Sequence, residues 1–435
     1  MRSHKPAIGF IFVTILLDAL GIGLLIPVSP KLVELLTGGS VEGAAPVVGY
    51  LGATYAAMQF LFAPMLGSLS DRVGRRPVLL IALFGSAIDY FAGACVPTVG
   101  WLFITRAING FSGASFSVAA AYIADITPPT KRAGAYGMMG AAFGLGFIIG
   151  PLLGGYLGHL SLRLPFFAAG GLTLANWLYG LVVLPESLPK DRRRAFSLAR
   201  ANPVGAFTHL RKYRIVLGIA VATLLLNTAQ FALHSVWVLY TSYQYGWDEM
   251  HVGFSLACVG VGAAAVQGFL ARKLVPKLGE KRAMIIGVSI GVLAYIGYGS
   301  VPPGYGWMIY VIVCFASLGA IGQPAAQSLI TRVVKPTEQG ETQGALSSLQ
   351  SFANILGPLI GSSVFAYFIS DKVPFKIPGA PFYVSATLAL LGLGVIAFTL
   401  SRHKFEAAVD HPHEPGERLP SDLAVEEQAS TGAAP

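Results

Sequence analysis

The chain has 435 residues, of which 54% are hydrophobic and only 12% are charged, and its mean hydropathy is +0.64. A soluble protein carries about twice this fraction of charged residues, so the composition excludes an ordinary soluble protein. It predicts an all-α membrane protein with the lipid bilayer as its surroundings. Cys95, Cys258 and Cys314 are spaced for neither a disulfide framework nor a metal site, and no metal is expected.

Twelve apolar segments are long enough to span a bilayer, and each must be a helix because backbone groups in lipid have to bond within their own segment. They cover about 8–28, 46–66, 78–96, 99–122, 134–158, 163–184, 214–241, 250–271, 283–301, 307–331, 341–369 and 381–401. A polar, basic linker over 185–213 separates an N-terminal six-helix bundle, 1–184, from a C-terminal one, 214–401. Residues 402–435 are expected to form a disordered cytoplasmic tail.

Lys and Arg are distributed unequally over the two sides of this topology. With the N-terminus inside, 25 of the 30 basic residues fall in inside segments, and Arg106 lies within the membrane. The four outside residues are Lys31, Arg163, Lys372 and Lys376. The positive-inside rule therefore predicts that both termini are cytoplasmic. The net charge of +9 follows from this topology and does not indicate a nucleic-acid partner.

The loop after the second segment, residues 67–77, holds four charges that cannot lie in hydrocarbon. An acid among arginines exceeds what the positive-inside rule requires. We therefore expect a conformational latch, in which Asp71 meets a helix N-terminus or an arginine; the alternative is a merely basic loop. The latch residues, including two glycines that permit close backbone approach, are Gly67, Asp71, Arg72, Gly74, Arg75 and Arg76.

Three charged residues, Asp18, Asp89 and Arg106, lie well inside apolar segments. Each costs about 2.5–3.5 kcal/mol on insertion scales, which makes a functional role the first hypothesis. Asp18 is placed near the midplane and is a candidate for proton coupling or substrate binding. Asp89 and Arg106 flank one turn at equal depth and could form an ion pair, either static or changing during transport.

The fifth segment carries a smooth helical stripe of Gly146, Gly150 and Gly154, beside Pro151 and Gly155. Such a stripe permits close helix packing, and the proline permits a kink. Its Gly150-Pro-Leu-Leu-Gly-Gly is echoed 207 residues later by Gly357-Pro-Leu-Ile-Gly-Ser, which indicates two related halves with substrate bound between them.

Polar residues in the apolar segments are candidates for a substrate cavity, because a polar stripe in lipid must face protein or water. In the seventh segment, Asn227, Gln230 and His234 share one helix face. A lone histidine is also commonly a packing residue. The full set of candidates is Gln59, Asn109, Asn227, Gln230, His234, Gln267 and Gln323.

The 67–77 loop resembles the G-x-L-x-D-R-x-G-R-R signature of the major facilitator superfamily, and about 8–400 resembles its tetracycline/proton antiporter branch. The resemblance implies that Arg106 takes part in proton coupling and that Asp125 meets the latch arginines. It also implies that the Gly146–Gly155 motif belongs to antiporters. Gly291 and Ala263 stand where the tetracycline exporters carry an acid and a histidine, which leaves Asp18 and Asp89 as the carboxylates at depth.

The resemblance implies proton-coupled efflux of a small amphiphilic molecule, most simply a tetracycline-like drug, from a bacterial inner membrane. The coupling ion is H⁺, a divalent cation can accompany such a substrate, and a monomer is expected. One alternative is proton-coupled uptake or exchange of a small metabolite; another is a non-transporting receptor or scaffold. The segments contain no His-Glu-x-x-His motif that would indicate a zinc-dependent enzyme.

Overall fold

The computed structural model describes residues 5–113, 115–128, 131–193, 214–334 and 338–402, and their secondary structure is helical. The N-terminal half consists of α1 (Lys5–Leu25), α2 (Ser29–Leu36), α3 (Val41–Val73), α4 (Arg75–Ala94), α5 (Val99–Gly113), α6 (Ser115–Ile126), α7 (Arg132–Leu160) and α8 (Leu164–Val183). A short 3₁₀ helix, η2 (Lys190–Arg192), follows. Most of the predicted linker, 194–213, and nearly all of the predicted tail, 403–435, lie outside the described residues.

The C-terminal half consists of α10 (Arg214–Tyr245), α11 (Glu249–Ala265), η4 (Val266–Leu270), α12 (Ala271–Leu278), α13 (Glu280–Ser300), α14 (Trp307–Ser317), η5 (Leu318–Ile321), α15 (Gly322–Val333), α16 (Gln339–Ile369) and α17 (Ala380–Arg402). The eighth predicted segment contains a π-helical turn at η4, and the tenth contains a 3₁₀ turn at η5.

Ten helices of the described chain are long and apolar enough to cross a membrane, and the pair α1 and α2, bent by 40°, makes an eleventh if it is counted as one span. At 33 residues α3 is also long enough, although Tyr55 and Gln59 lie at its centre and lower its hydropathy. With α3 included, the twelve predicted crossings are present. Helix α2 was not predicted, because its eight residues lie in a stretch interpreted as a loop.

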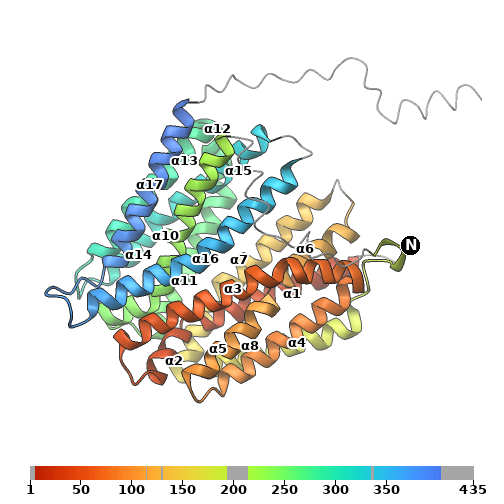
Figure 1. The fold of residues 1–435 in the computed structure, drawn as a ribbon, viewed down its shortest axis with the longest axis horizontal. Helices are drawn as coiled ribbons and strands as arrows, with labels where there is room; N and C mark the ends of the chain where they lie inside the picture. The colour runs from red at the N-terminus through yellow and green to blue at the C-terminus, as the bar shows by residue number, and fades with distance from the viewer. Residues whose placement is uncertain (1–4, 114, 129–130, 194–213, 335–337, 403–435) are drawn as a thin grey trace, which may run out of the picture.

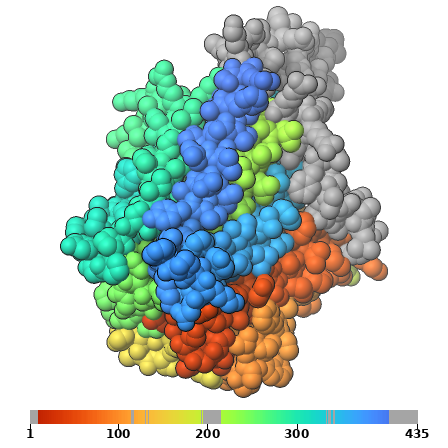
Figure 2. All heavy atoms as spheres, turned by 60° about the vertical axis from the view of Figure 1, so that its left-hand side comes forward, coloured from red at the N-terminus to blue at the C-terminus, as the bar shows by residue number. Residues whose placement is uncertain are grey.

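The two halves lie side by side, with α3 of one against α16 of the other and α7 against α11 (Figure 1). In the space-filling view the blue surface of α16 meets the red surface near the start of the chain (Figure 2). Seen along the helices, the bundle has two ends. We call the one that carries Arg75, Arg132 and Arg282 the basic end and the other the α2 end.

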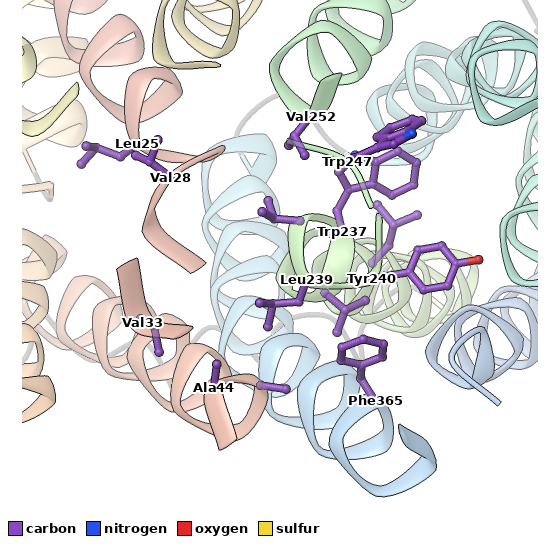
Figure 3. Close-up of a cluster of buried hydrophobic side chains, with 14 of the residues drawn as sticks. Leu25, Val28, Val33, Ala44, Trp237, Leu239, Tyr240, Trp247, Val252 and Phe365 are labelled. Carbon is purple, nitrogen blue, oxygen red and sulfur yellow. The ribbon is translucent and has the colours of Figure 1, made fainter. Parts of the chain in front are cut away.

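At the α2 end one hydrophobic core runs through both halves. Side chains of α1 to α3, among them Val28 and Val33, join a cluster with Trp237 and Tyr240 of α10 and Phe365 of α16 (Figure 3). Towards the basic end the core divides into two clusters, each formed by residues of one half only. Apolar packing therefore joins the halves at the α2 end and leaves them separate at the basic end.

Glycines let the helices of the two halves approach each other closely at the α2 end. A Cβ on Gly49 of α3 would lie 2.8 Å from the Pro358 carbonyl oxygen, and one on Gly253 of α11 would lie 2.3 Å from that of Pro151. Nearer the basic end, a Cβ on Gly140 or on Gly344 would meet open space. The molecule is thus closed at the α2 end.

Candidate functional site

The latch loop forms a network around Arg75, the first residue of α4. The Arg75 guanidinium contacts Asp71 on α3 (Nη2 to Oδ1, 2.7 Å) and Asp125 on α6 (Nε to Oδ2, 3.2 Å). It also donates a hydrogen bond to the Ser70 hydroxyl. Of the two predicted partners for Asp71, the structure selects the arginine. All of these residues belong to the N-terminal half, so the network joins α3, α4 and α6 within one half.

The N-terminus of α4 is occupied instead by Glu186, which sequence analysis missed. Its Oε1 accepts the Arg75 backbone N–H at 2.8 Å, and its Oε2 accepts that of Arg76 at 3.3 Å. A carboxylate is stabilising here because the helix N-terminus carries unsatisfied N–H groups and a partial positive charge. Gly74, with φ of 110°, lets the carboxylate approach, since a Cβ there would lie 2.3 Å from Oε2.

The remaining latch residues take other positions. The Arg76 guanidinium donates to the Leu181 carbonyl oxygen at 2.7 Å and not to Asp71 or Asp125. Arg72 is exposed, and a Cβ on Gly67 would meet open space. Glu186 follows directly after an apolar segment, and an acid at that position was the signal that could have suggested this helix cap.

We expect Glu186→Gln to destabilise the N-terminal half by about 1 kcal/mol, because it removes the charge at the α4 N-terminus and weakens two hydrogen bonds. Thermal unfolding of the purified protein measures this as a lower midpoint. Asp191→Asn is the matched control, because Asp191 is an exposed acid five residues further on. If the two variants unfold at the same midpoint, Glu186 does not stabilise the N-terminus of α4.

The second group of charges lies inside the N-terminal bundle. Asp89 of α4 is buried, with its Oδ2 3.9 Å from Nη2 of Arg106 on α5. Asn109, one turn further along α5, donates to the same oxygen, while Oδ1 of Asp89 has no hydrogen-bond partner. The predicted pair is therefore present and only loosely closed, with one carboxylate oxygen unsatisfied.

Asp18 of α1 is half-buried and makes no hydrogen bond or ion pair with another described residue. It lies within electrostatic range of Tyr55 and Tyr90, which are also within range of Asp89 and Arg106. The structure thus brings the three predicted charges into one cluster with two tyrosines. Gln59 lies near it on α3, where its amide donates to the Tyr55 hydroxyl and to the Gly113 carbonyl oxygen.

The predicted glycine motif of α7 serves two neighbours. Gly146, Gly150 and Gly154 face α1, where added Cβ atoms would lie within 2.9 Å of the α1 backbone. The Pro151 carbonyl oxygen and Gly155 face α11 of the other half, and a Cβ on Gly155 would lie 2.6 Å from the Glu249 carbonyl oxygen. The motif therefore packs α7 tightly against both its own half and the opposite half.

A cavity of about 600 Å³ lies within the C-terminal half, between α10, α11 and α13 to α17. Four predicted cavity residues line it: Asn227, Gln230, His234 and Gln323. The Gln230 amide nitrogen lies 2.8 Å from Nε2 of His234, and its oxygen accepts from the Tyr295 hydroxyl at 3.1 Å.

Three predicted cavity residues lie elsewhere. Gln267 is exposed on η4, Asn109 binds Asp89, and Gln59 binds Tyr55. Gln267 was predicted from its polarity, whereas in the structure it lies on η4 outside the cavity wall. Sequence analysis also missed cavity residues on α16. Gln343, Ser347 and Gln350 line the cavity, and their spacing of four and three residues was the signal that could have found them.

An ion pair and a histidine–carboxylate contact link the two halves at the α2 end. Lys31 of α2 contacts Glu249 of α11 at 3.3 Å and donates to the Trp247 carbonyl oxygen at 3.2 Å. His159 of α7 lies 3.7 Å from Asp248, the N-cap of α11. These residues are 89 or more positions apart in the chain, so periodicity could not have paired them.

Asp248 is charged at neutral pH. Its burial raises its pKa, but hydrogen bonds from the backbone and ring of His251, with the charges of His251 and His159, lower the pKa below the ordinary 3.8. A lowered pKa means that the stabilisation is present above pH 3.8 and is lost only as the pH falls through the lowered value. The carboxylate is therefore available to His159 across the neutral range.

This helical architecture and the sequence match a known protein family. The family model of the Major Facilitator Superfamily matches residues 11–358 and 300–425. The chain belongs to this superfamily. It is a multi-pass membrane transporter and not an enzyme, and the predicted fold is confirmed.

Bacterial relatives are similar over most of this transporter. It is 39% identical to tetracycline resistance protein, class C, of Escherichia coli over 366 residues, which are 84% of this chain and 91% of the relative. It is 36% identical to tetracycline resistance protein, class B, of Escherichia coli over 357 residues, which are 80% and 86% of the two chains.

Solved structures share the fold. The human organic anion transporter TETRAN superposes with a TM-score of 0.65 at 24% identity, covering 91% of this chain and all of the other. A bacterial homologue of the human lysosomal transporter Spinster, in an inward-facing and unoccupied conformation, superposes with a TM-score of 0.74 at 16% identity, covering 94% and 100%.

Proposed function

We propose that this protein exports a small amphiphilic molecule, of the tetracycline-like kind, in exchange for protons. The observation that carries the proposal is the 39% identity to a tetracycline resistance protein over 91% of that protein's length. One chain contains both halves, the cavity and the acid cluster, so a monomer is sufficient for this function.

In this proposal the basic end faces the cytoplasm, as the distribution of Lys and Arg favours. The α2 end is then the outer end, and its closure corresponds to the inward-facing state. Substrate enters the cavity from the cytoplasm. The Lys31–Glu249 and His159–Asp248 contacts break as the outer end opens, and the Arg75 network holds the N-terminal half together during the change.

Proton coupling is assigned to the cluster of Asp18, Asp89 and Arg106. Asp18 has no partner among the described residues, and Asp89 has one unsatisfied oxygen. A charged carboxylate without compensation is costly in a low-dielectric site, so each can take up a proton when the site faces outward. Protonation of Asp89 would also weaken its attraction to Arg106 and change the packing of α4 against α5.

Everted membrane vesicles energised to an acid interior test this function. Tetracycline and then neutral amphiphiles are added, while a pH-sensitive dye reports proton release and the drug content of the vesicles is measured. Drug accumulation coupled to proton release is the expected result. Proton release with a small metabolite and no response to any drug would favour the metabolite carrier, and no response to either would favour a receptor or scaffold.

Lys31→Met is expected to open the α2 end, because it removes the ion pair with Glu249 and the hydrogen bond to Trp247. For a partly buried pair the loss is about 1 kcal/mol, roughly five-fold in the ratio of the two states. Electron-spin distances between labels at Leu35 and Lys372, in a chain without exposed cysteines, should shift to longer values.

Lys376→Met is the matched control for this prediction. Lys376 binds Asp371 at 2.8 Å within the C-terminal half, so its loss breaks an ion pair whose two members belong to one half. If both variants give the distances of the unaltered protein, the Lys31 contacts do not hold the α2 end closed.

A further inference from the structure

Among the residues that the structure describes, the wall of the cavity in the C-terminal half contains no Asp, Glu, Lys or Arg. This part of the wall therefore offers no carboxylate, ammonium or guanidinium group. The charges within the membrane, Asp18, Asp89 and Arg106, belong to α1, α4 and α5 of the other half. Charge and cavity are therefore separated between the two halves.

What the wall offers instead is a set of primary amides. They come from α10, α15 and α16, and they are Asn227, Gln230, Gln323, Gln327, Gln343 and Gln350. Each amide has one acceptor oxygen and two N–H donors, so the set can satisfy many polar groups on a ligand without requiring that the ligand carry charge. Trp237, Tyr298 and Met284 add apolar surface to the same wall.

Most of these amides are free to bind a ligand. Gln230 is engaged with His234 and Tyr295. The side chains of the other five amides make no hydrogen bond to any other described residue. These five side chains are exposed or half-buried where they line the cavity, so they bind water in the empty cavity and exchange it for ligand atoms.

We propose that this cavity binds an electrically neutral amphiphile that presents several hydroxyl, carbonyl or amide groups, and that it binds it without a divalent cation. The inference rests on the proposed function and names the substrate class for it. A cation in this cavity would lack a counter-charge, which is costly in a low-dielectric site. A bound Mg²⁺ would lack the carboxylate that protein sites for this ion use.

Calorimetric titration of the purified full-length protein in detergent tests the inference with four additions. They are chloramphenicol, which is neutral; tetraphenylphosphonium, a permanent cation; and tetracycline with either magnesium chloride or EDTA. We expect chloramphenicol to bind at least ten-fold more tightly than tetraphenylphosphonium, and tetracycline to bind equally well with either addition. Tighter binding of the cation, or a requirement for Mg²⁺, would overturn the proposal.

Variants locate the site. Gln350→Leu should weaken chloramphenicol binding about five- to ten-fold, the loss typical of one hydrogen-bonding partner, and Gln350→Asn should recover part of it. Gln267→Leu is the matched control, because Gln267 is an exposed glutamine of the same half that does not line the cavity. If the two leucine variants weaken chloramphenicol binding equally, the amides of the cavity wall do not take part in binding.

The titration needs no transport, so its outcome is separable from that of the vesicle assay. Binding of chloramphenicol in a protein that moves no drug would sustain the cavity assignment and overturn the export function. Drug export that requires Mg²⁺ would sustain the export function and overturn the cavity assignment.

Discussion

Gly155→Leu is expected to prevent closure of the α2 end and to reduce transport by a factor of roughly 5 to 150. Any Cβ at this position would lie 2.6 Å from the Glu249 carbonyl oxygen and 3.2 Å from Cα of Met250. Both are backbone atoms, so no side-chain rotation relieves the contact. Overpacking of this kind costs about 1–3 kcal/mol, which corresponds to that range of rates when it falls on one state only.

The measurement is the initial rate of drug accumulation in everted vesicles containing equal amounts of folded protein. Gly144→Leu is the matched control, because Gly144 lies on the same helix and a Cβ there meets open space. The same four carbon atoms are added in both variants. If Gly155→Leu transports as fast as Gly144→Leu, close approach of α7 and α11 is not required in the transport cycle.

Asp18→Asn is expected to abolish proton-driven accumulation while leaving insertion and folding intact. Asn has the size of Asp and resembles its protonated form, but it cannot exchange a proton. Because Asp18 has no partner among the described residues, the change breaks no ion pair. Accumulation in energised vesicles should fall to the level of de-energised ones, whereas exchange of labelled for unlabelled drug should continue.

Asp371→Asn is the control for this variant, since Asp371 is an exposed acid whose partner is Lys376. It should retain full accumulation. If Asp18→Asn accumulates drug as fast as the unaltered protein under a proton gradient, proton coupling is assigned to Asp89 and not to Asp18. Loss of exchange as well as accumulation would instead indicate that Asp18 serves substrate passage.

Comparison of the prediction with the structure shows which signals in a sequence are local. The spans followed from apolar length, and the Asp89–Arg106 pair followed from equal depth on either side of one turn. Contacts between separated elements were found only where both partners stood out as charges at unusual places. Glu186 was missed because its partner is the backbone of a helix N-terminus more than 100 residues away, so the position of the acid after an apolar segment did not by itself name the partner. The coupling, latch and antiporter roles assigned to the site residues stay predictions until the variants are measured.

By itself, the sequence determined that this chain crosses the membrane repeatedly, because every apolar segment must satisfy its own backbone hydrogen bonds in lipid. That requirement acts segment by segment and can therefore be read locally. Only the tertiary structure decided which polar groups meet: Glu186 with the N-terminus of α4, Lys31 with Glu249, and the amides of α10, α15 and α16 around one cavity. It also decided which end is closed, because closure depends on how two complete bundles pack, and two packings of the same helices can differ by only a few kcal/mol.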